Sequence, residues 1–180
     1  MARLQKFPTL SIIIPTLNEA IHLPLLIADL NAWPYNFELI VVDGGSTDLT
    51  TSIAKIQGLD VIKSPKKSRG YQLKIGASNA KGDWLLFLHA DSRLDSTWAK
   101  STYKIIQNKT SENFAWYFDF KIKKYNIEFR FLELAVALRS QFLQLPYGDQ
   151  GLLIHKDLYL NSGEFSSLKI MEDIDLVTRI

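Results

Sequence analysis

Cysteine is absent from the 180 residues, which rules out disulfide bonds and leaves no thiolate to act as a nucleophile or a metal ligand. This composition is compatible with a reducing compartment, and we expect a cytoplasmic protein. An excess of one charge is missing too, because 21 basic and 19 acidic residues leave a net charge of +2. That balance gives no whole-molecule case for binding nucleic acid, although "KSPKKSR" at 63–69 is a local basic cluster.

Long apolar runs are also missing, and no window approaches the roughly 20 apolar residues of a membrane-spanning helix. The first residues, "MARLQKFPTLSIII", contain a short apolar stretch that ends at Pro15, which predicts a strand rather than a signal peptide. An apolar content of 47% is enough for a core, and the length fits one domain over residues 1–180. The sequence stops at "EDIDLVTRI", a helical pattern without a C-cap signal, so truncation at a domain boundary is one interpretation of this end.

Short apolar runs alternate with helical patterns along the first half of the chain. The expected strands cover residues 10–15, 37–43, 60–64 and 83–89, and the expected helices cover 19–31, 46–56 and 70–80. The strands are apolar throughout, which is typical of a parallel sheet with helices on both faces. We therefore predict an α/β fold with a mostly parallel central sheet.

The second half of the chain has a different pattern. Residues 114–123, "FAWYFDFKIK", alternate like a strand, and residues 145–159 predict a loop, a strand and a short helix. Between them, residues 127–145 carry a broad apolar stripe at helical spacing. The ordinary interpretation is a helix packed on the core. The alternative is a helix that contacts a membrane surface, a hydrophobic acceptor or a partner chain such as a second copy.

Polar residues follow each expected strand of the first half. In a parallel sheet, ligands bind beyond the carboxyl ends of the strands, so Glu19, Asp43, Arg69 and Asp91 should gather along one edge. "VVDGGSTD" at 41–48 places Asp43 before two glycines, which suits either ligand binding or a plain strand-to-helix turn. Neither G-x-G-x-x-G nor a P-loop occurs, which disfavours a nicotinamide cofactor.

The sequence "FLHAD" ends the fourth expected strand with two side chains that can bind a cation. Asp91 is an oxygen ligand suited to Mg²⁺ or Mn²⁺, whereas His89 is an auxiliary group that suits Mn²⁺ better than Mg²⁺. Arg69, at the same edge, is suited to bind diphosphate oxygens in a bidentate manner.

A second acidic cluster lies near the end of the chain, where "MEDIDL" supplies Glu172, Asp173 and Asp175. Acids at the start of a helix favour its macrodipole, which is a sufficient structural reason for them. The functional interpretation is that one of them is a general base. Spacing alone does not choose among the three.

Five motifs connect these residues to a known family. The chain contains, in this order, "SIIIPTLNE", "VVDGGSTD", "SRGYQLKIGASNAKGDWLLFLHAD", "YGDQG" and "MEDIDL". Together they resemble the family-two glycosyltransferases, and they are most similar to the bacterial subgroup in which H-A-D replaces the usual D-x-D. The resemblance covers nearly the whole chain. It implies a nucleotide-diphospho-sugar (GT-A) fold and an inverting transfer from a nucleotide sugar.

The resemblance also implies roles for single residues. Asp173 matches the catalytic base of the family's E-D motif, with Glu172 beside it. Asp91 matches the second acid of D-x-D and would hold Mg²⁺ or Mn²⁺ on the diphosphate, with His89 in place of the first acid. The nucleotide would contact Pro15, Thr16, Glu19, Asp43 and Arg69. The sugar and the acceptor would contact Asp149 and Gln150.

The resulting hypothesis is a single glycosyltransferase domain made of two halves. Residues 1–95 would form the nucleotide-binding half, and residues 96–180 would form the acceptor-side half. The donor would be a UDP- or GDP-sugar, and the acceptor an unidentified hydroxyl compound, lipid-linked compounds included. The protein would act in the cytoplasm or at the membrane periphery. The alternative is a module that binds nucleotide sugars without transferring them, because the first acid of D-x-D is missing.

Overall fold

The computed structural model describes residues 9–119, 150–168 and 171–180. In these residues a five-stranded sheet has the strand order β3-β2-β1-β4-β5. The strands are β1 (Leu10–Thr16), β2 (Phe37–Asp43), β3 (Val61–Lys63), β4 (Trp84–Phe87) and β5 (Leu152–His155). The first four pair in parallel, and β5 lies antiparallel beside β4. The predicted mostly parallel sheet is confirmed.

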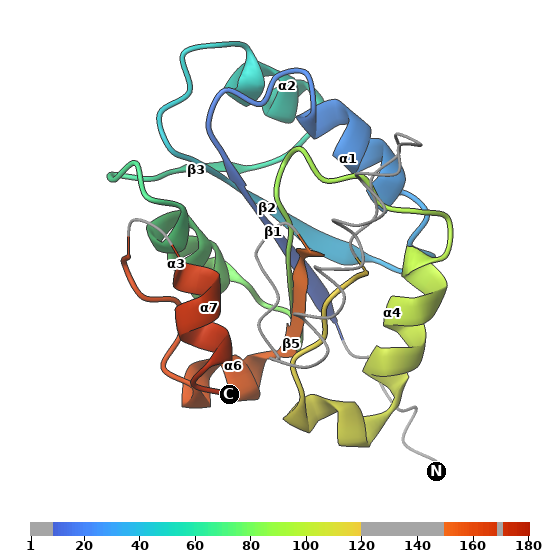
Figure 1. Cartoon of the computed structure of the whole chain (residues 1–180). Coiled ribbons are helices and arrows are strands. Elements are labelled where there is room, and N and C mark those ends of the chain that lie inside the picture. Colours follow the sequence, from blue (N-terminus) through green and yellow to red (C-terminus); the bar gives the residue numbers. More distant parts are fainter. Residues whose placement is uncertain (1–8, 120–149, 169–170) are drawn as a thin grey trace, which may run out of the picture.

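Helices cover both faces of this sheet, as predicted. They are α1 (Leu23–Leu30), α2 (Thr50–Ile56), α3 (Arg69–Asn79), α4 (Trp98–Gln107), α6 (Lys156–Asn161) and α7 (Glu172–Val177), with a 3₁₀ turn η1 (Lys109–Asn113). Helices α1, α2 and α4 pack on one face, and α3, α6 and α7 pack on the other (Figure 1). The carboxyl ends of the four parallel strands therefore open between two layers of helices.

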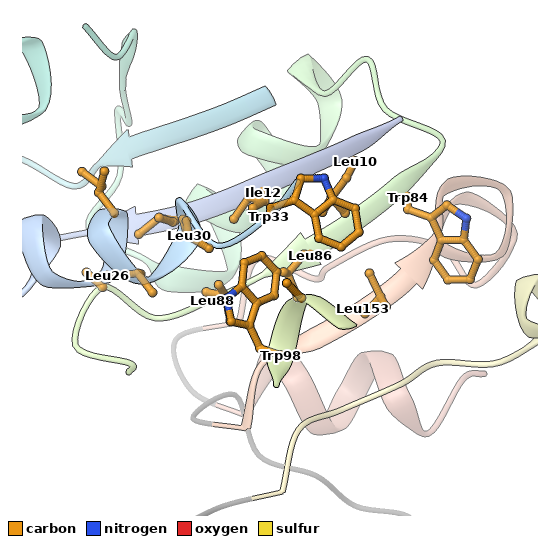
Figure 2. Close-up of a cluster of buried hydrophobic side chains, with 14 of the residues drawn as sticks. Leu10, Ile12, Leu26, Leu30, Trp33, Trp84, Leu86, Leu88, Trp98 and Leu153 are labelled. Atoms are coloured by element: carbon orange, nitrogen blue, oxygen red, sulfur yellow. The ribbon is translucent and has the colours of Figure 1, made fainter. Parts of the chain in front are cut away.

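The core on the first face fixes α1 and α4 against the sheet. Leu26 and Leu30 of α1 belong to the same buried cluster as Ile12 of β1 (Figure 2). Trp33, which follows α1, stacks on Trp98 of α4, with ring centroids 5.7 Å apart. Buried aromatic pairs of this kind contribute more than their buried area alone. The loop between β4 and α4, which carries the H-A-D sequence, is anchored at its far end by this packing.

On the second face, a glycine brings α3 close to the sheet. A Cβ atom added to Gly76 would lie 2.3 Å from Cγ2 of Ile13 in β1, so no other residue fits there without displacing the strand or the helix. Leu73 and Ala77 of the same helix are buried on either side of this contact. The close crossing places the first turn of α3 at the carboxyl edge of the sheet.

Several predicted boundaries differ from the structure. The helix expected over 19–31 begins at Leu23, because a turn precedes it and Pro24 occupies its first turn. The strand expected over 83–89 pairs only as far as Phe87, so His89 lies beyond the ladder. Helix α4 was not predicted. Its buried positions include Thr102, which breaks the apolar stripe that would have indicated a helix.

The second half of the chain is described only in part. In the strand expected over 114–123, the described residues 114–119 form one bridge, between Trp116 and Leu153 of β5. The helix expected over 127–145 and the predicted site residue Asp149 lie outside the described residues. Among the helices that the structure does describe, none is both long enough and apolar enough to cross a membrane.

Candidate active site

A pocket of about 240 Å³ opens at the carboxyl ends of β1 and β4, and we call it the rim pocket. Its lining consists of Pro15, Thr16, Leu17, Glu19, Lys67, Arg69, Gln72, His89, Ala90 and Asp91. Six of these residues were predicted from the sequence as nucleotide or metal ligands. They come from three separate segments of the chain, and the parallel sheet brings them together as expected.

The loop after β1 is held in place by the turn after β2. Asn18 has a left-handed φ of 59°, and its carboxamide oxygen accepts a hydrogen bond from the Thr47 amide at 2.8 Å. Asp48 accepts a hydrogen bond from the Ala20 amide at 3.1 Å. The hydroxyl of Thr50 also bonds Asp48, and this is the main reason that the pKa of Asp48 lies below its ordinary value. These hydrogen bonds join the loop after β1 to the turn after β2 at the carboxyl edge of the sheet.

Asp43 is placed differently from the other predicted nucleotide ligands. Its side chain is buried, and one carboxylate oxygen accepts hydrogen bonds from the amides of Gly45 and Ser46 at 2.9 and 3.0 Å. The other oxygen accepts from the Ser46 hydroxyl and, at 3.4 Å, from Thr16. These contacts occupy most of the acceptor capacity of a carboxylate. In this structure Asp43 holds the strand-to-helix turn, and its contact with a nucleotide stays a prediction.

Gln72 lines the rim pocket and was not predicted. Its side chain is buried in the first half of α3, and its amide nitrogen donates to the carbonyl oxygens of Thr16 and Val42 at 3.0 and 2.7 Å. It therefore ties the helix to the last residues of β1 and β2. The sequence did not predict this role, because both hydrogen-bond partners of the Gln72 amide are backbone groups of distant segments.

Arg69, at the start of α3, connects the two sides of the site. Its Nε donates to Oε1 of Glu172, the first residue of α7, in an ion pair. Its Nη1 lies 3.1 Å from Nε2 of His89. Glu172 is only 1% exposed, whereas the Arg69 side chain is 39% exposed and reaches the rim pocket. Buried carboxylates need such a partner, so α7 is linked to the rim pocket through this pair.

Close approach of α3 to α7 makes the Arg69 contact possible. A Cβ atom on Gly70 would lie 2.6 Å from the carbonyl oxygen of Ser166 and 3.0 Å from Cβ of Glu172. The Ser68 hydroxyl, which caps α3, donates to the carbonyl oxygen of Leu168 at 3.0 Å. Figure 1 shows α7 beside α3 near the carboxyl edge.

The three acids of "MEDIDL" have different surroundings, which distinguishes them as spacing could not. Glu172 pairs with Arg69. Asp175 accepts from the Ser166 hydroxyl at 2.6 Å and from Arg179 at 2.8 Å, and these two bonds lower its pKa. Asp173 is half-buried and borders a small cavity of about 20 Å³, which we call the base cavity. Oδ1 of Asp173 accepts a hydrogen bond from the Ile174 amide at 3.0 Å, and Glu172 lines the same cavity. The role of Asp173 as the base stays a prediction.

His89 lines both the rim pocket and the base cavity. The base cavity is otherwise formed by α7, Leu73 of α3, Phe165, the end of β4 and the start of β5, with Gly151 at a left-handed φ of 67°. The neighbouring Gln150 is buried, and its amide nitrogen donates to the Phe118 carbonyl oxygen at 3.2 Å. A ligand that fills the rim pocket would thus meet His89 between its own position and Asp173.

The family resemblance implies a divalent cation, and the residues present can hold one through the Asp91 carboxylate together with a bound diphosphate. In the part of the chain that the structure describes, no group of three His, Cys, Asp or Glu side chains could hold a metal ion. Asp91 offers an exposed carboxylate in the rim pocket, whereas Glu19 pairs with His22 at 2.9 Å. Mg²⁺ is often held by one or two carboxylates, with waters and substrate phosphates completing its coordination. This set fits a cation that is shared with a bound diphosphate.

Comparison with known sequences agrees with the motifs. The family model described as "Glycosyl transferase family 2" matches residues 11–153. A curated relative, the PGL/p-HBAD biosynthesis glycosyltransferase of Mycobacterium bovis, is 40% identical over 94 residues, which are 48% of this chain and 37% of that protein. The match thus spans little more than a third of the relative's length.

Solved structures share the fold. Staphylococcus aureus TarS in complex with UDP-GlcNAc superimposes with a TM-score of 0.74 and 21% identity, over 95% of this chain and 52% of that one. The mannosyltransferase PcManGT from Pyrobaculum calidifontis, in complex with GDP-Man and Mn²⁺, has a TM-score of 0.72 and 18% identity, over 95% and 51%. The predicted GT-A fold is confirmed by these matches.

Proposed function

This chain belongs to glycosyl transferase family 2, and we propose that it transfers a sugar from a uridine or guanosine diphosphate sugar to a hydroxyl group, with inversion at the anomeric carbon. TarS and PcManGT, which share its fold, bind UDP-GlcNAc and GDP-Man respectively. We place the chain in the subgroup whose fourth strand leads into H-A-D. In this proposal residues 1–95 bind the nucleotide, and residues 96–180 provide the acceptor side.

The proposal rests above all on the junction of the rim pocket and the base cavity at His89. The rim pocket carries a guanidinium and a carboxylate, Arg69 and Asp91, which suit a diphosphate with a shared cation. The base cavity carries Asp173. A donor whose diphosphate lies in the rim pocket would direct its sugar past His89 toward that carboxylate.

The proposed reaction is a single displacement. The acceptor oxygen attacks the anomeric carbon while the bond from that carbon to the diphosphate oxygen breaks, and the electron pair leaves with the nucleotide. Asp173 takes the proton of the acceptor hydroxyl, a role that typically contributes 10²–10⁴-fold. Arg69 stabilises the charge that develops on the departing diphosphate. A divalent cation on Asp91 would neutralise more of that charge when bound.

The experiment that tests this function has two stages. Thermal shift and calorimetry with UDP, GDP, their sugars and a control nucleotide such as CMP should show selective binding of one uridine or guanosine diphosphate. Hydrolysis of that donor, with and without acceptor extracts, should then release the nucleoside diphosphate faster when an acceptor is present. Absence of any diphosphate binding would contradict the proposal. Binding without turnover would instead identify a non-catalytic nucleotide-sugar module.

A further inference from the structure

We propose that His89 is a positioning residue for Arg69 rather than a metal ligand. Arg69, held by His89 and Glu172, then acts as the protein's own cation for the diphosphate. The divalent cation binds through Asp91 and the phosphates together, so the protein acquires affinity for it only after the nucleotide is bound. This inference rests on the proposed function, because it assigns the charges of that same site.

His89 accepts a hydrogen bond from Arg69. Its Nε2 lies 3.1 Å from Nη1 of Arg69. A guanidinium has only N–H donors and stays protonated in proteins, so Nε2 must be the acceptor of this hydrogen bond. In the neutral imidazole the proton is then on Nδ1. Neither ring nitrogen keeps a lone pair for a metal ion while this contact is made.

Arg69 is held in one orientation by two neighbouring side chains. Its Nε is bonded to Glu172, a side chain that is 1% exposed. The guanidinium has five N–H donors, more than the contacts to Glu172 and His89 use. The Arg69 side chain is 39% exposed and lines the rim pocket, so its outer edge is available to phosphate oxygens. His89 and Glu172 thus fix the plane of a cation that faces the ligand.

Asp91 remains in the rim pocket as a ligand for a divalent cation. The guanidinium beside His89 repels a second positive charge at that position. Lys67 adds another cationic side chain to the same pocket. Asp91 is exposed, and among the described residues it belongs to no group of three metal-binding side chains. One carboxylate with waters is a weak site, which the phosphates of a bound nucleotide would complete.

The test measures two affinities separately, using Mn²⁺ and the nucleoside diphosphate that the binding screen selects. Mn²⁺ binding is followed by electron paramagnetic resonance, with and without saturating nucleotide, and nucleotide binding is followed by calorimetry in chelator. We expect wild-type protein alone to bind Mn²⁺ at least about tenfold more weakly than the nucleotide complex does. His89→Ala should weaken nucleotide binding in chelator by about tenfold, because Arg69 loses its orientation, and should leave Mn²⁺ affinity of the complex within about threefold.

Two further variants separate a positioning role from a ligand role. His89→Gln offers an amide oxygen to Arg69 and should restore nucleotide affinity in chelator to within about threefold of wild type. Asp91→Asn should have the opposite effect: it should abolish Mn²⁺ binding to the complex and should not weaken nucleotide binding in chelator, because the lost carboxylate repels a diphosphate when no cation is bound. Circular dichroism melts confirm that each variant is folded. The His89→Gln measurement tests the proposal by itself should His89→Ala fail to fold.

Several results would overturn the inference. The first is tenfold weaker Mn²⁺ binding by the His89→Ala or His89→Gln complex, with nucleotide affinity in chelator unchanged, which would make His89 a metal ligand. The second is Mn²⁺ binding by the free protein as tight as binding by the complex. Absence of nucleotide binding by wild type under every condition is a distinguishable third result, because it removes the proposed function and this inference with it.

Discussion

The two sides of the site are built in different ways. The rim pocket is formed by the ends of parallel strands and the turns that follow them, with partners supplied by neighbouring strand-helix units. The wall that carries Asp173 is formed by α7, whose first residue pairs with Arg69, 103 positions earlier in the chain. The strand order of the sheet determines the rim pocket. The position of the α7 wall depends instead on a long-range contact between the first residue of α3 and the first residue of α7. If Asp173 is the base, its replacement should leave nucleotide binding intact, whereas replacement of Glu172 should not, because Glu172 holds Arg69.

The largest effect is expected at Asp173. Asp173→Asn is nearly isosteric and keeps a side-chain oxygen that can accept from the Ile174 amide, as Oδ1 of Asp173 does at 3.0 Å. It should lower transfer by 10²–10⁴-fold, as removal of a general base does, and leave nucleotide affinity unchanged. The measurement is transfer rate at saturating donor, with calorimetry of the nucleotide alongside.

The neighbouring acid supplies the matched control for this prediction. Glu172→Gln keeps the shape of the side chain but removes the charge that holds Arg69. It should weaken nucleotide binding as well as turnover, unlike Asp173→Asn. Transfer by Asp173→Asn at a near wild-type rate would show that Asp173 is not the base, and loss of nucleotide binding by that variant would contradict the separation of the two sides.

The next effect concerns Gly70, where α3 meets α7. Gly70→Ala would place a Cβ atom 2.6 Å from the carbonyl oxygen of Ser166, in the segment before α7, and 3.0 Å from Cβ of Glu172, which forces α3 away from both. Overpacking of this kind costs about 1–3 kcal/mol of stability, and it should also lower nucleotide affinity because Glu172 moves away from Arg69. Thermal melts and calorimetry measure the two effects.

Gly58 supplies a control that separates the effect of backbone strain from the effect of moving α3 away from α7. Gly58 has a φ of 75° and no atom within 4 Å of an added Cβ atom, so Gly58→Ala introduces backbone strain away from the site. It should lower the melting temperature and leave nucleotide affinity intact. Equal nucleotide affinities for the two variants would show that the contact between α3 and α7 does not control the rim pocket.

Much of the rim pocket could be predicted from the sequence, because strand order and turn residues determine it. Apolar runs that end in Pro15, Asp43 and the H-A-D sequence indicated parallel strands, and parallel strands place their carboxyl ends together. What the spacing could not reveal is which polar group is already satisfied. Asp43 bonds its own turn, and its hydrogen bonds to backbone amides leave no mark in the residue pattern.

Different roles for the three acids of α7 could be proposed from the sequence only through the family motif. Three acids within four positions look alike in sequence, and their difference lies in tertiary partners: Arg69 for Glu172, and Ser166 with Arg179 for Asp175. Gln72 was missed for the same reason, since its partners are carbonyl groups of two other strands. Local pattern identifies elements well, but it does not pair side chains across a hundred residues.

A smaller effect is expected where α3 is tied to the sheet. Gln72→Leu retains most of the side-chain volume but removes the amide that bonds Thr16 and Val42. The Thr16 carbonyl also accepts from the Gly44 amide at 2.8 Å, so the cost should be about 1 kcal/mol, at the low end for buried polar groups that lose a partner. For a chain of this length that is a fall in melting temperature of about 2–4 °C. No fall at all would mean that the strand ends are held by the sheet alone.

The smallest effect is the pH dependence of two aspartates, one on each side of the site. The pKa of Asp48 is lowered first by the Thr50 hydroxyl, and that of Asp175 first by the Ser166 hydroxyl and then by Arg179. A folded-state pKa below the unfolded value means that each carboxylate stabilises the fold at neutral pH. The contribution is lost as pH falls below about 4 and through the folded-state pKa. Asp48→Asn and Asp175→Asn should therefore melt below wild type at neutral pH, and the difference should close in acid.

These two variants should differ in which affinity changes. Asp48 bonds the loops that line the rim pocket, so Asp48→Asn should weaken nucleotide binding slightly. Asp175 orients Arg179, whose guanidinium also bonds the carbonyl oxygens of Ser162 and Glu164, so Asp175→Asn should loosen α7 and lower turnover instead. Melting temperatures from about pH 3 to pH 7, with Asp60→Asn as an exposed control, test the titration. A melting difference that stayed constant across this range would show that neither hydrogen-bonded carboxylate is the titrating group.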